Sequence, residues 1–429
     1  MSYNGGLPYG PGHEGRQVFW NIHGFEEVLL YVVTFVVLAI MAYGIYRRWK
    51  MWKAMGLPEN RTDRPLERIK SLVVNGLFQV RTFRESYAGI FHGLIFFGFI
   101  VLIFGAAIDA THYRFPLPFF YGSFYLWFSL ILEIFGLAVL IGVILAVVRR
   151  YVWKPDLLGY QGKPDNRPDD AVVLVLLALI IVTGFIVEAL RLHVNINVDG
   201  FTWGHWSFVG YALSKTLTGV DYEFTLLLHR INWWVHAALA FVFLAYIPFS
   251  RLFHIFTTSA NYYLRSLEPV GTLQPIADFE NAESFGVGRL EEFTWKQIFD
   301  SDACTRCGRC QDGCPAYLSG KPLSPKKVIQ DIKEHWQDRV PQVLAAKALA
   351  KKNGGEPEIP EPEKALVGDV IDLHELWACT NCMYCMENCP ALIEHVPQIV
   401  GMRQYKVLME ADFSPELQLT YRNMENNSN

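Results

Sequence analysis

Five long apolar runs constrain this chain more than any other feature of its sequence. They lie at approximately residues 25–46, 87–110, 121–148, 171–190 and 231–253. Each run is rich in Leu, Ile, Val and Phe, and a helix needs about 20 such residues to cross the hydrocarbon core of a bilayer. Buried helices of a soluble core are the alternative, but such helices are shorter and fewer. The runs therefore predict an all-α membrane protein with a five-span transmembrane helical bundle.

The distribution of Lys and Arg between the spans predicts the orientation, because positively charged loops stay on the cytoplasmic side. The first and third connections, residues 47–84 and 149–167, carry ten and five of these residues, whereas the opposite side carries five. We therefore expect a multi-pass protein of the cytoplasmic (inner) membrane with its N-terminus outside. No cleavable signal peptide is expected, since residues 1–21 lack a basic stretch followed by an apolar one.

All eight cysteines lie beyond residue 300, in two short runs. Each run reads C-x2-C-x2-C-x3-C-P, the spacing of ferredoxins in which the fourth cysteine binds the other cluster. The first predicted [4Fe–4S] cluster is held by Cys304, Cys307, Cys310 and Cys389. The second is held by Cys379, Cys382, Cys385 and Cys314. Zinc is the rival for four thiolates, although it usually binds two separated C-x2-C pairs, and disulfides are disfavoured in a reducing cytoplasm.

The interval between the cysteine runs predicts helices. Ser324 and Pro325 make a good N-cap and first-turn pair, and we expect helices over 326–336 and 340–352, followed by a Pro- and Glu-rich break. Residues 297–400 resemble the α-helical ferredoxin of succinate dehydrogenase iron–sulfur subunits and heterodisulfide reductase small subunits. The resemblance implies a mainly α-helical dicluster ferredoxin domain.

The expected organisation is therefore a series of five segments. These are an external N-terminal tail (1–24), a cytochrome b-type membrane domain (25–258), a cytoplasmic connector (259–296), the dicluster ferredoxin domain (297–400) and a C-terminal tail (401–429). The net charge of −4 and the lack of a basic patch outside the membrane loops argue against a nucleic-acid partner.

Histidines inside the spans suggest haem, because ionisable groups in a membrane point to function. His92 lies early in the second span, while His236 and His254 lie 18 residues apart on the fifth. That spacing places both on one stripe of a straight helix, although Pro248 lies between them. A b-type haem takes two axial ligands, usually imidazoles, and His92 and His254 have matching cytoplasmic depth. Histidines bonded to carbonyl groups or interfacial water are the alternative.

The fifth span and the Phe91-His92-Gly93 stretch resemble the respiratory nitrate reductase gamma subunit family. That family is a five-span, N-out cytochrome b with two stacked haems and a quinol site. The resemblance implies that His92 and His254 hold the inner haem b. The family has another histidine on its second span, and the corresponding residue here is Leu102, which cannot bind iron. We therefore expect one haem and leave a second open, with His236 and either His193 or His229 as ligands of the outer site.

A quinone site beside a haem is a further implication of this resemblance. Glu133, in the third span, and Glu188 and Arg191, at the end of the fourth, can hydrogen-bond a quinone or exchange a proton with it. His193 is a further candidate. For each residue the alternative is a position at the membrane interface or a hydrogen bond between helices.

The joined architecture resembles membrane-bound iron–sulfur oxidoreductases related to heterodisulfide reductase. Several of these accept electrons from electron-transfer flavoprotein and reduce menaquinone. The resemblance implies a quinone-linked iron–sulfur oxidoreductase, alone or as a subunit of a complex, that carries electrons between such a donor, or another redox subunit, and the quinone pool of the lipid bilayer. The alternatives are a membrane subunit of a heterodisulfide or thiol–disulfide reductase-like complex, and a non-catalytic electron-conduit anchor. The direction of electron flow is left open.

Two motifs are absent from the sequence. It has no Rossmann or Walker phosphate-binding loop, so we expect flavin or nucleotide chemistry to belong to a partner, and no catalytic residue is assigned. It also lacks the Cys-Cys-Gly repeats into which such oxidoreductases commonly continue. We expect either a truncated chain or a separate subunit that supplies that domain.

Overall fold

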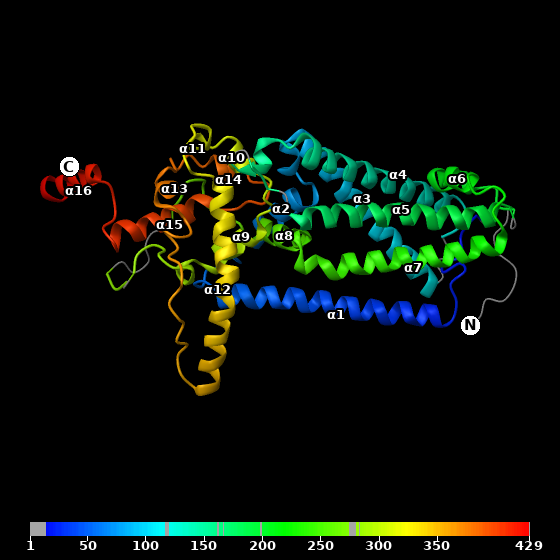
Figure 1. Ribbon diagram of the computed structural model, residues 1–429, viewed down its shortest axis with the longest axis horizontal. Helices are drawn as coiled ribbons and strands as arrows, with labels where there is room; N and C mark the ends of the chain where they lie inside the picture. Colours follow the sequence, from blue (N-terminus) through cyan, green and yellow to red (C-terminus); the bar gives the residue numbers. More distant parts are fainter. Residues whose placement is uncertain are drawn as a thin grey trace. The chain divides into compact units, whose positions relative to one another are not determined.

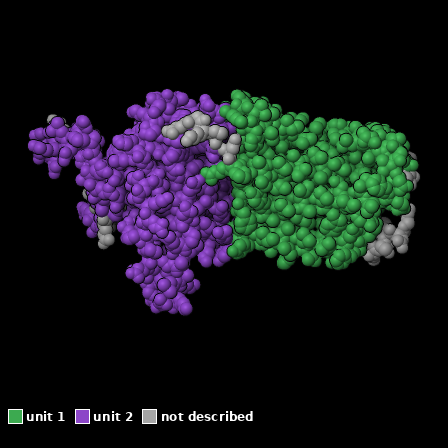
Figure 2. All heavy atoms as spheres, viewed as in Figure 1, with its two compact units in different colours: residues 1–44, 82–154, 166–252 green, residues 45–81, 155–165, 253–429 purple. Residues whose placement is uncertain are grey.

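The structure is a computed structural model of the chain, and it describes residues 14–115, 120–160, 163–165, 167–197, 200–273, 280–282 and 284–428. Part of the expected N-terminal tail (1–13) and part of the expected connector (274–279 and 283) lie outside the described residues. The chain divides into two compact units (Figure 2). Unit 1 comprises Met1–Gly44, Thr82–Lys154 and Asn166–Leu252, and unit 2 comprises Ile45–Arg81, Pro155–Asp165 and Phe253–Asn429.

Five helices in the described part of the chain are long and apolar enough to cross a membrane. They are α1 (Phe25–Ala54), α3 (Ser86–Arg114), α4 (Ser123–Val147, continued by a π-helical turn to Trp153), α5 (Pro168–Asn197) and α7 (Tyr222–Tyr246). Figure 1 shows α3, α4, α5 and α7 running side by side, with the short helix α6 (Phe208–Lys215) beside α5. The predicted all-α, five-span membrane fold is confirmed.

Unit 1 is held together by close packing between its helices. Gly98 on α3 lets α4 approach, because a Cβ atom there would come within 2.4 Å of Val139 Cγ2. Val139 belongs to an apolar cluster with Ile181 of α5 and Phe243 of α7, and Leu102 packs against the same cluster. The position where the nitrate reductase gamma family has its other second-span histidine is thus part of the packed apolar core.

The fifth span differs from the expected one in both its bounds and its continuity. It begins at Tyr222, since the Asp221 side chain caps it by accepting a hydrogen bond from Phe224 N at 3.1 Å. The α-helix ends at Tyr246, just before Pro248, and two 3-10 turns, Ile247–Phe249 and Arg251–Phe253, follow it. Proline lacks an N–H donor and clashes with the preceding turn, which explains the break. The expectation of one straight helical stripe through His236 and His254 is therefore wrong.

Unit 2 is mainly helical. Its helices are α2 (Pro65–Leu72), α8 (His254–Leu264), α9 (Trp295–Ala303), α10 (Arg309–Asp312), α11 (Pro315–Leu318), α12 (Pro325–Asn353), α13 (Leu373–Trp377), α14 (Tyr384–Glu387), α15 (His395–Leu408) and α16 (Pro415–Asn427). A small antiparallel hairpin pairs β1 (Gly159–Tyr160) with β2 (Lys163–Pro164). The segment 155–165, which connects the third and fourth spans, thus belongs to unit 2.

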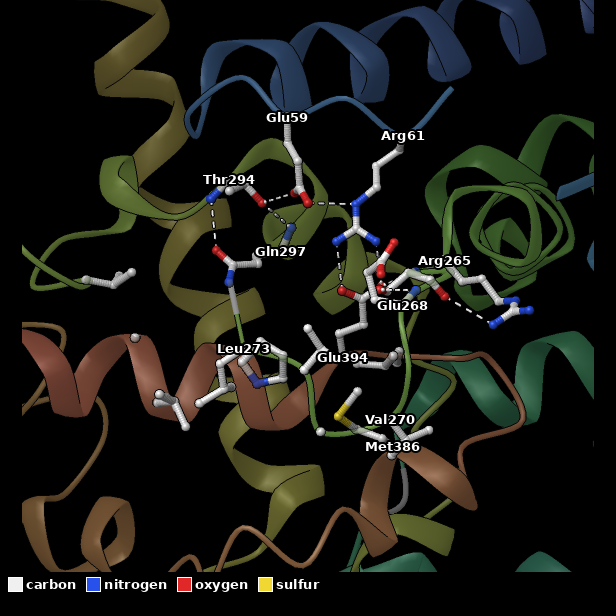
Figure 3. Close-up of a pocket in the computed structure, with 18 of the residues that line it drawn as sticks. Glu59, Arg61, Arg265, Glu268, Val270, Leu273, Thr294, Gln297, Met386 and Glu394 are labelled. Carbon is white, nitrogen blue, oxygen red and sulfur yellow. Dashed lines mark hydrogen bonds and ion pairs between the residues drawn. The ribbon is translucent and has the colours of Figure 1, made fainter. Parts of the chain in front are cut away.

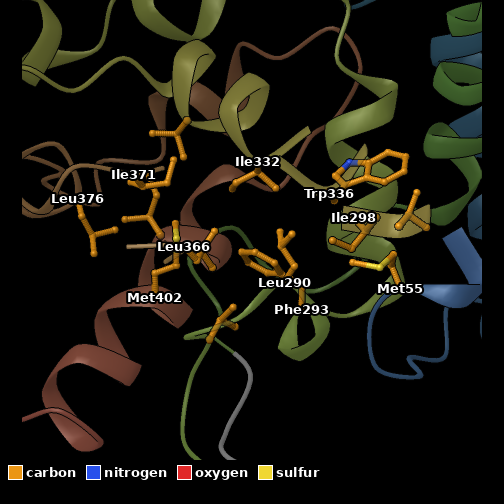
Figure 4. Packing of buried hydrophobic residues seen from close by; sticks show 14 of the residues in the cluster. Met55, Leu290, Phe293, Ile298, Ile332, Trp336, Leu366, Ile371, Leu376 and Met402 are labelled. Atoms are coloured by element: carbon orange, nitrogen blue, oxygen red, sulfur yellow. The ribbon is translucent and has the colours of Figure 1, made fainter. Parts of the chain in front are cut away.

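The core of unit 2 forms around α12, the longest helix of this unit (Figure 4). Trp336 is fully buried and its Nε1 donates to Ser301 Oγ at 2.7 Å. Ser324 caps the helix as expected by accepting a hydrogen bond from Lys327 N. The expected pair of helices is a single one, because α12 continues through Pro341 until Gly354, whose φ of 71° ends it.

Candidate functional site

The two cysteine runs adopt the same local backbone. In the first run Arg306 and Gly308 have positive φ angles of 55° and 81°. At the matching positions of the second run Asn381 and Met383 have φ angles of 52° and 63°. These left-handed residues turn the chain back on itself, so that Asn381 N donates to Cys379 Sγ at 3.4 Å. Each run therefore forms a tight loop that presents its cysteines from one side.

The eight thiols line two cavities, four to each. Each of the two cavities is lined by the first three cysteines of one cysteine run and the last cysteine of the other run. The first is lined by Cys304, Cys307, Cys310 and Cys389, and the second by Cys314, Cys379, Cys382 and Cys385. The structure thus brings together the same two sets of thiols that the ferredoxin spacing predicts as ligands.

The thiol arrangement fits iron–sulfur clusters. Four thiols around each cavity match the number of cysteine ligands that a [4Fe–4S] cluster takes. Burial raises the pKa of Cys385 to about 12 and that of Cys310 well above its ordinary value. A positively charged centre is therefore needed to hold these groups as thiolates.

A buried network of charges supports the loop that follows Cys389. Figure 3 shows Arg61 facing Glu394, with its Nη1 and Nη2 atoms donating to the carboxylate at 3.0 and 2.8 Å. Lys296 Nζ lies 2.8 Å from Asp300 Oδ1 and 3.5 Å from Glu394 Oε1. Burial alone would raise the pKa of Glu394, but Lys296 and Arg61 lower it to about 2. The carboxylate therefore stays ionised and fixes this loop.

Asn261 connects the same loop to helix α8. Its Nδ2 atom donates to the carbonyl oxygen of Ala391 at 2.8 Å and to Asp300 Oδ1 at 2.9 Å. Because α8 begins at His254, two helical turns separate the predicted haem ligand from this hydrogen bond. The last cysteine of the second run is thus held within unit 2 by the helix that carries His254.

A cavity of about 400 Å³ opens beside this network (Figure 3). Arg61, Arg265 and Glu394 form its polar wall, while Leu273 and Met386 contribute apolar surface. None of the predicted cysteine, histidine or quinone-site residues lines it.

The predicted haem ligands lie on different helices. His92 is on α3 of unit 1, and His254 is the first residue of α8 in unit 2. The pairing of these two histidines stays a prediction from the sequence. His236 of α7 makes a contact of 3.1 Å between its Nδ1 and Thr183 Oγ1 on α5. His236 therefore lies beside the turn of α5 that carries Thr183.

The proposed partners of His236 are not beside it. His193 is ten residues beyond Thr183 on α5, about 15 Å further along that helix, and its Nδ1 lies 3.1 Å from the side-chain nitrogen of Asn197. His229 packs edge-on against Trp20, with ring centroids 4.7 Å apart. Two ligands of one iron must lie on opposite sides of the same porphyrin, so these positions do not fit an outer haem on His236.

The three predicted quinone-site residues meet in the interior of unit 1. The carboxyl groups of Glu133 and Glu188 hydrogen-bond each other, and Arg191 Nη2 lies 3.3 Å from Glu188 Oε1. Glu133 also accepts hydrogen bonds from the amides of Val209 (2.7 Å) and Gly210 (3.3 Å), at the start of α6. Gly210 leaves room for the pair, since a Cβ atom there would lie 2.8 Å from Glu188 Cγ.

Several residues of these sites were not identified from the sequence. Arg306, Lys326 and His395 line the first thiol cavity, and Asp165 faces both cations from the segment between spans three and four. Of these residues, only Lys326 could have been noticed in the sequence, because a cation in the first turn of a helix is unfavourable to the helix dipole and therefore unusual. Its buried partners depend on long-range folding that periodicity does not reveal.

Two regions of the chain match models of known families. Residues 82–270 match the nitrate reductase gamma subunit family, and residues 303–394 match the 4Fe-4S dicluster domain. The first region includes His92, His236 and His254, together with the Glu133–Glu188 pair. The second includes all eight cysteines. The family match supports iron–sulfur over zinc at the thiol sites.

Three curated relatives cover the chain to different extents. The chain is 36% identical to the EtfAB:quinone oxidoreductase of Syntrophomonas wolfei, over 94% of this chain and 58% of the relative. It is 31% identical to the probable iron-sulfur-binding oxidoreductase FadF of Bacillus subtilis, over 94% of this chain and 59% of the relative. Identity to a component of the dihydromethanophenazine:CoB--CoM heterodisulfide reductase of Methanosarcina acetivorans is 33%, over 25% of this chain and 24% of the relative.

The chain spans slightly under three fifths of the first two relatives. No solved structure matches it significantly. The first match covers four of the five candidate spans, α3, α4, α5 and α7, and the second covers both thiol-bearing loops. Residues 82–270 are therefore similar to the nitrate reductase gamma subunit family, and residues 303–394 are similar to a 4Fe-4S dicluster domain.

Proposed function

We propose that this chain carries electrons between a soluble flavoprotein of the electron-transfer flavoprotein type and menaquinone in the membrane. The observation that carries the proposal is the occurrence of eight cysteines in two four-thiol sites on the same chain as a five-span membrane domain. The two relatives that match 94% of the chain, one named a quinone oxidoreductase and one an iron-sulfur-binding oxidoreductase, support it.

Each site has assigned residues in this proposal. Cys304, Cys307, Cys310 and Cys389 hold one [4Fe–4S] cluster, and Cys314, Cys379, Cys382 and Cys385 hold the other. His92 and His254 hold one b-type haem. When bound, clusters and haem supply one-electron transfer. The Lys and Arg bias of the connections supports an N-terminus outside the cell and an iron–sulfur unit in the cytoplasm.

The quinone site is the polar cluster of Glu133, Glu188 and Arg191. A hydrogen bond between two carboxyl groups requires a proton on one of them, so the pair can exchange that proton with a quinone oxygen. Arg191 holds the Glu188 carboxylate in place and adds a donor. We assign His229 to the same region, because its residue is 2% exposed and its Nδ1 has no hydrogen-bond partner among the described residues. Such an atom can bond a quinone oxygen.

A heterodisulfide reductase-like role is the second candidate. The similarity to a component of heterodisulfide reductase covers only a quarter of the chain, so it supports the shared iron–sulfur part and not the membrane half. The quinone-linked function accounts for both halves.

The test uses the full chain in lipid vesicles that contain a menaquinone analogue. Reduced electron-transfer flavoprotein should reduce the haem, as seen in its α-band, and quinol should then accumulate. Glu188→Gln, which keeps the side-chain volume, should slow quinol formation at least tenfold while the haem still becomes reduced. Lys215→Gln serves as a control at an exposed cation. If the wild-type haem is reduced only by a dithiol substrate, or if quinone never reoxidises it, the proposal is wrong.

A further inference from the structure

The two thiol cavities differ in the charge of their walls. The first cavity includes Arg306 and Lys326, whose residues are 7% and 4% exposed. The described residues that line the second include neither Lys nor Arg, and its non-cysteine wall is mainly Leu323, Val396 and Ile399 with Tyr384. Arg403 lies near the second set, where its Nη2 donates to the carbonyl oxygen of Cys379 at 2.6 Å. The first set has two cations in its wall, so the two bound centres meet different arrangements of charge.

Lys326 is held in place by the segment between the third and fourth spans. Its Nζ atom donates to the carbonyl oxygens of Leu158 (2.8 Å) and Gly159 (3.3 Å) and lies 3.3 Å from Asp165 Oδ2. Lys326 also stands in the first turn of α12, where the helix dipole disfavours a cation. The three oxygen partners therefore offset an otherwise unfavourable position and fix the ammonium group at the cavity wall.

The same segment is locked to the first cysteine loop. Gln311 Nε2 donates to the carbonyl oxygens of Leu157 (3.1 Å) and Gly159 (2.9 Å), and the Ser324 hydroxyl, at the cap of α12, donates to Gln311 Oε1 at 2.6 Å. Leu157 O comes so near Gly308 that a Cβ atom there would be 1.7 Å from it. The position of Lys326 relative to the cysteine loop is thus set by a rigid hydrogen-bonded frame.

Two cations share one carboxylate at this wall. Asp165 lies 3.3 Å from Lys326 Nζ through its Oδ2 and 3.1 Å from Arg306 Nη1 through its Oδ1. His395 also lines this cavity, and its Nδ1 lies 3.1 Å from the carbonyl oxygen of Ile393. Reduction of a [4Fe–4S] cluster adds one negative charge, which a neighbouring cation in a low-dielectric site stabilises.

We propose that Lys326 and Arg306, held by the 155–165 segment, raise the reduction potential of the cluster bound by Cys304, Cys307, Cys310 and Cys389. The proposal rests on the iron–sulfur assignment under the proposed function, but not on quinone chemistry. Cys382, at the other cluster, is the exposed cysteine of the eight. With both clusters bound, the exposed Cys382 site would be open to a soluble donor, and the Lys326 site would hold the more readily reduced centre. One centre is oxidised as the other is reduced, and no bond or proton changes place.

The test is an anaerobic redox titration of the full chain, followed by electron paramagnetic resonance of the two clusters. Lys326→Met should lower the midpoint potential of one cluster and leave the other unchanged. An effect of about tenfold on the equilibrium between the centres corresponds to about 59 mV for a one-electron couple. Lys326→Arg should keep the wild-type potential. Lys327→Met is the matched control, because Lys327 is the next residue of the same helix and faces Asp331 and Glu375 instead.

Asp165→Asn should shift the reduction potential of this cluster in the opposite direction. It keeps both cations and removes their shared counter-charge, so the potential of the same cluster should rise. A merely structural role of this frame would not shift the potential in opposite directions in the two variants. Unchanged potentials in Lys326→Met and Asp165→Asn, at full iron content, would overturn the proposal. If the wild-type chain shows no iron–sulfur signal at all, the proposed function fails instead.

Discussion

Four residues with left-handed backbone decide how the cysteines are presented. Gly308 is the only glycine among Arg306, Gly308, Asn381 and Met383, and an L-residue in this conformation costs about 1–2 kcal/mol. Three of the four positions therefore carry strain that the tertiary structure must offset. Strained backbone of this kind gathers at functional sites, and here it aims the thiols of each run into a cavity.

Serine substitutions test which thiols share a centre. Cys307→Ser and Cys389→Ser should abolish the same iron–sulfur signal, with a loss of about four irons per chain, because these thiols line one cavity. Cys382→Ser and Cys314→Ser should abolish the other signal. Electron paramagnetic resonance of the four reduced variants measures this. If Cys389→Ser and Cys382→Ser instead abolished the same signal, each cysteine run would hold its own cluster.

Alanine substitutions test the haem ligands. His92→Ala or His254→Ala should remove the low-spin haem band while both iron–sulfur signals persist, because each variant deletes one axial imidazole. His193→Ala is the control, since its ring faces Asn197, and it should keep full haem. Optical spectra of purified variants give the haem content. A normal haem content in both His92→Ala and His254→Ala would refute the assignment.

At the scale of elements, the 155–165 segment, which follows the third span in the chain, packs against the first cysteine loop. Gly308 and Gly320 make a matched pair, because both have positive φ but only Gly308 faces a close atom, Leu157 O. Each alanine variant should carry the conformational cost of about 1–2 kcal/mol. Gly308→Ala should in addition displace the segment, which will lower the thermal midpoint further and release iron sooner. Equal midpoints for the two variants would contradict this docking.

The buried ion pair behind Cys389 gives a second prediction at this scale. Arg61→Met leaves Glu394 without its bidentate partner, which should cost about 3–5 kcal/mol because Lys296 alone then faces two buried carboxylates, Glu394 and Asp300. Arg64→Met is the control, since that side chain is 40% exposed and its solvent-screened pair with Glu268 should contribute little to stability. Thermal unfolding of both variants compares them. A similar loss in each would show that the Arg61 pair is not stabilising.

Sequence patterns predicted some elements well and others poorly, for identifiable reasons. The membrane helices and the thiol loops follow from local patterns, namely apolar length and cysteine spacing, and both appear in the structure. The start of α7 was missed because Glu223 and Arg230 dilute its hydropathy, although Asp221 caps it. Charge partners such as Asp165 for Lys326 lie more than 150 residues apart in the chain, so no local pattern could join them.

At the scale of the molecule, the chain combines two parts with different requirements. The membrane part buries polar groups where Glu133, Glu188 and Arg191 meet, and also buries Arg149 and Asp170 elsewhere. The other part buries charges freely but pairs them, as Lys296 with Asp300 and Glu394 illustrates. In the proposed function, the two parts together connect a soluble electron donor with a lipid-soluble acceptor.

The most direct measurement is the content of iron and acid-labile sulfide in anaerobically purified full-length protein. Two [4Fe–4S] clusters and one haem require about nine irons and eight sulfides per chain. That result would establish the metal centres on which every other step depends. Zinc at the thiol sites, without acid-labile sulfide, would contradict the account.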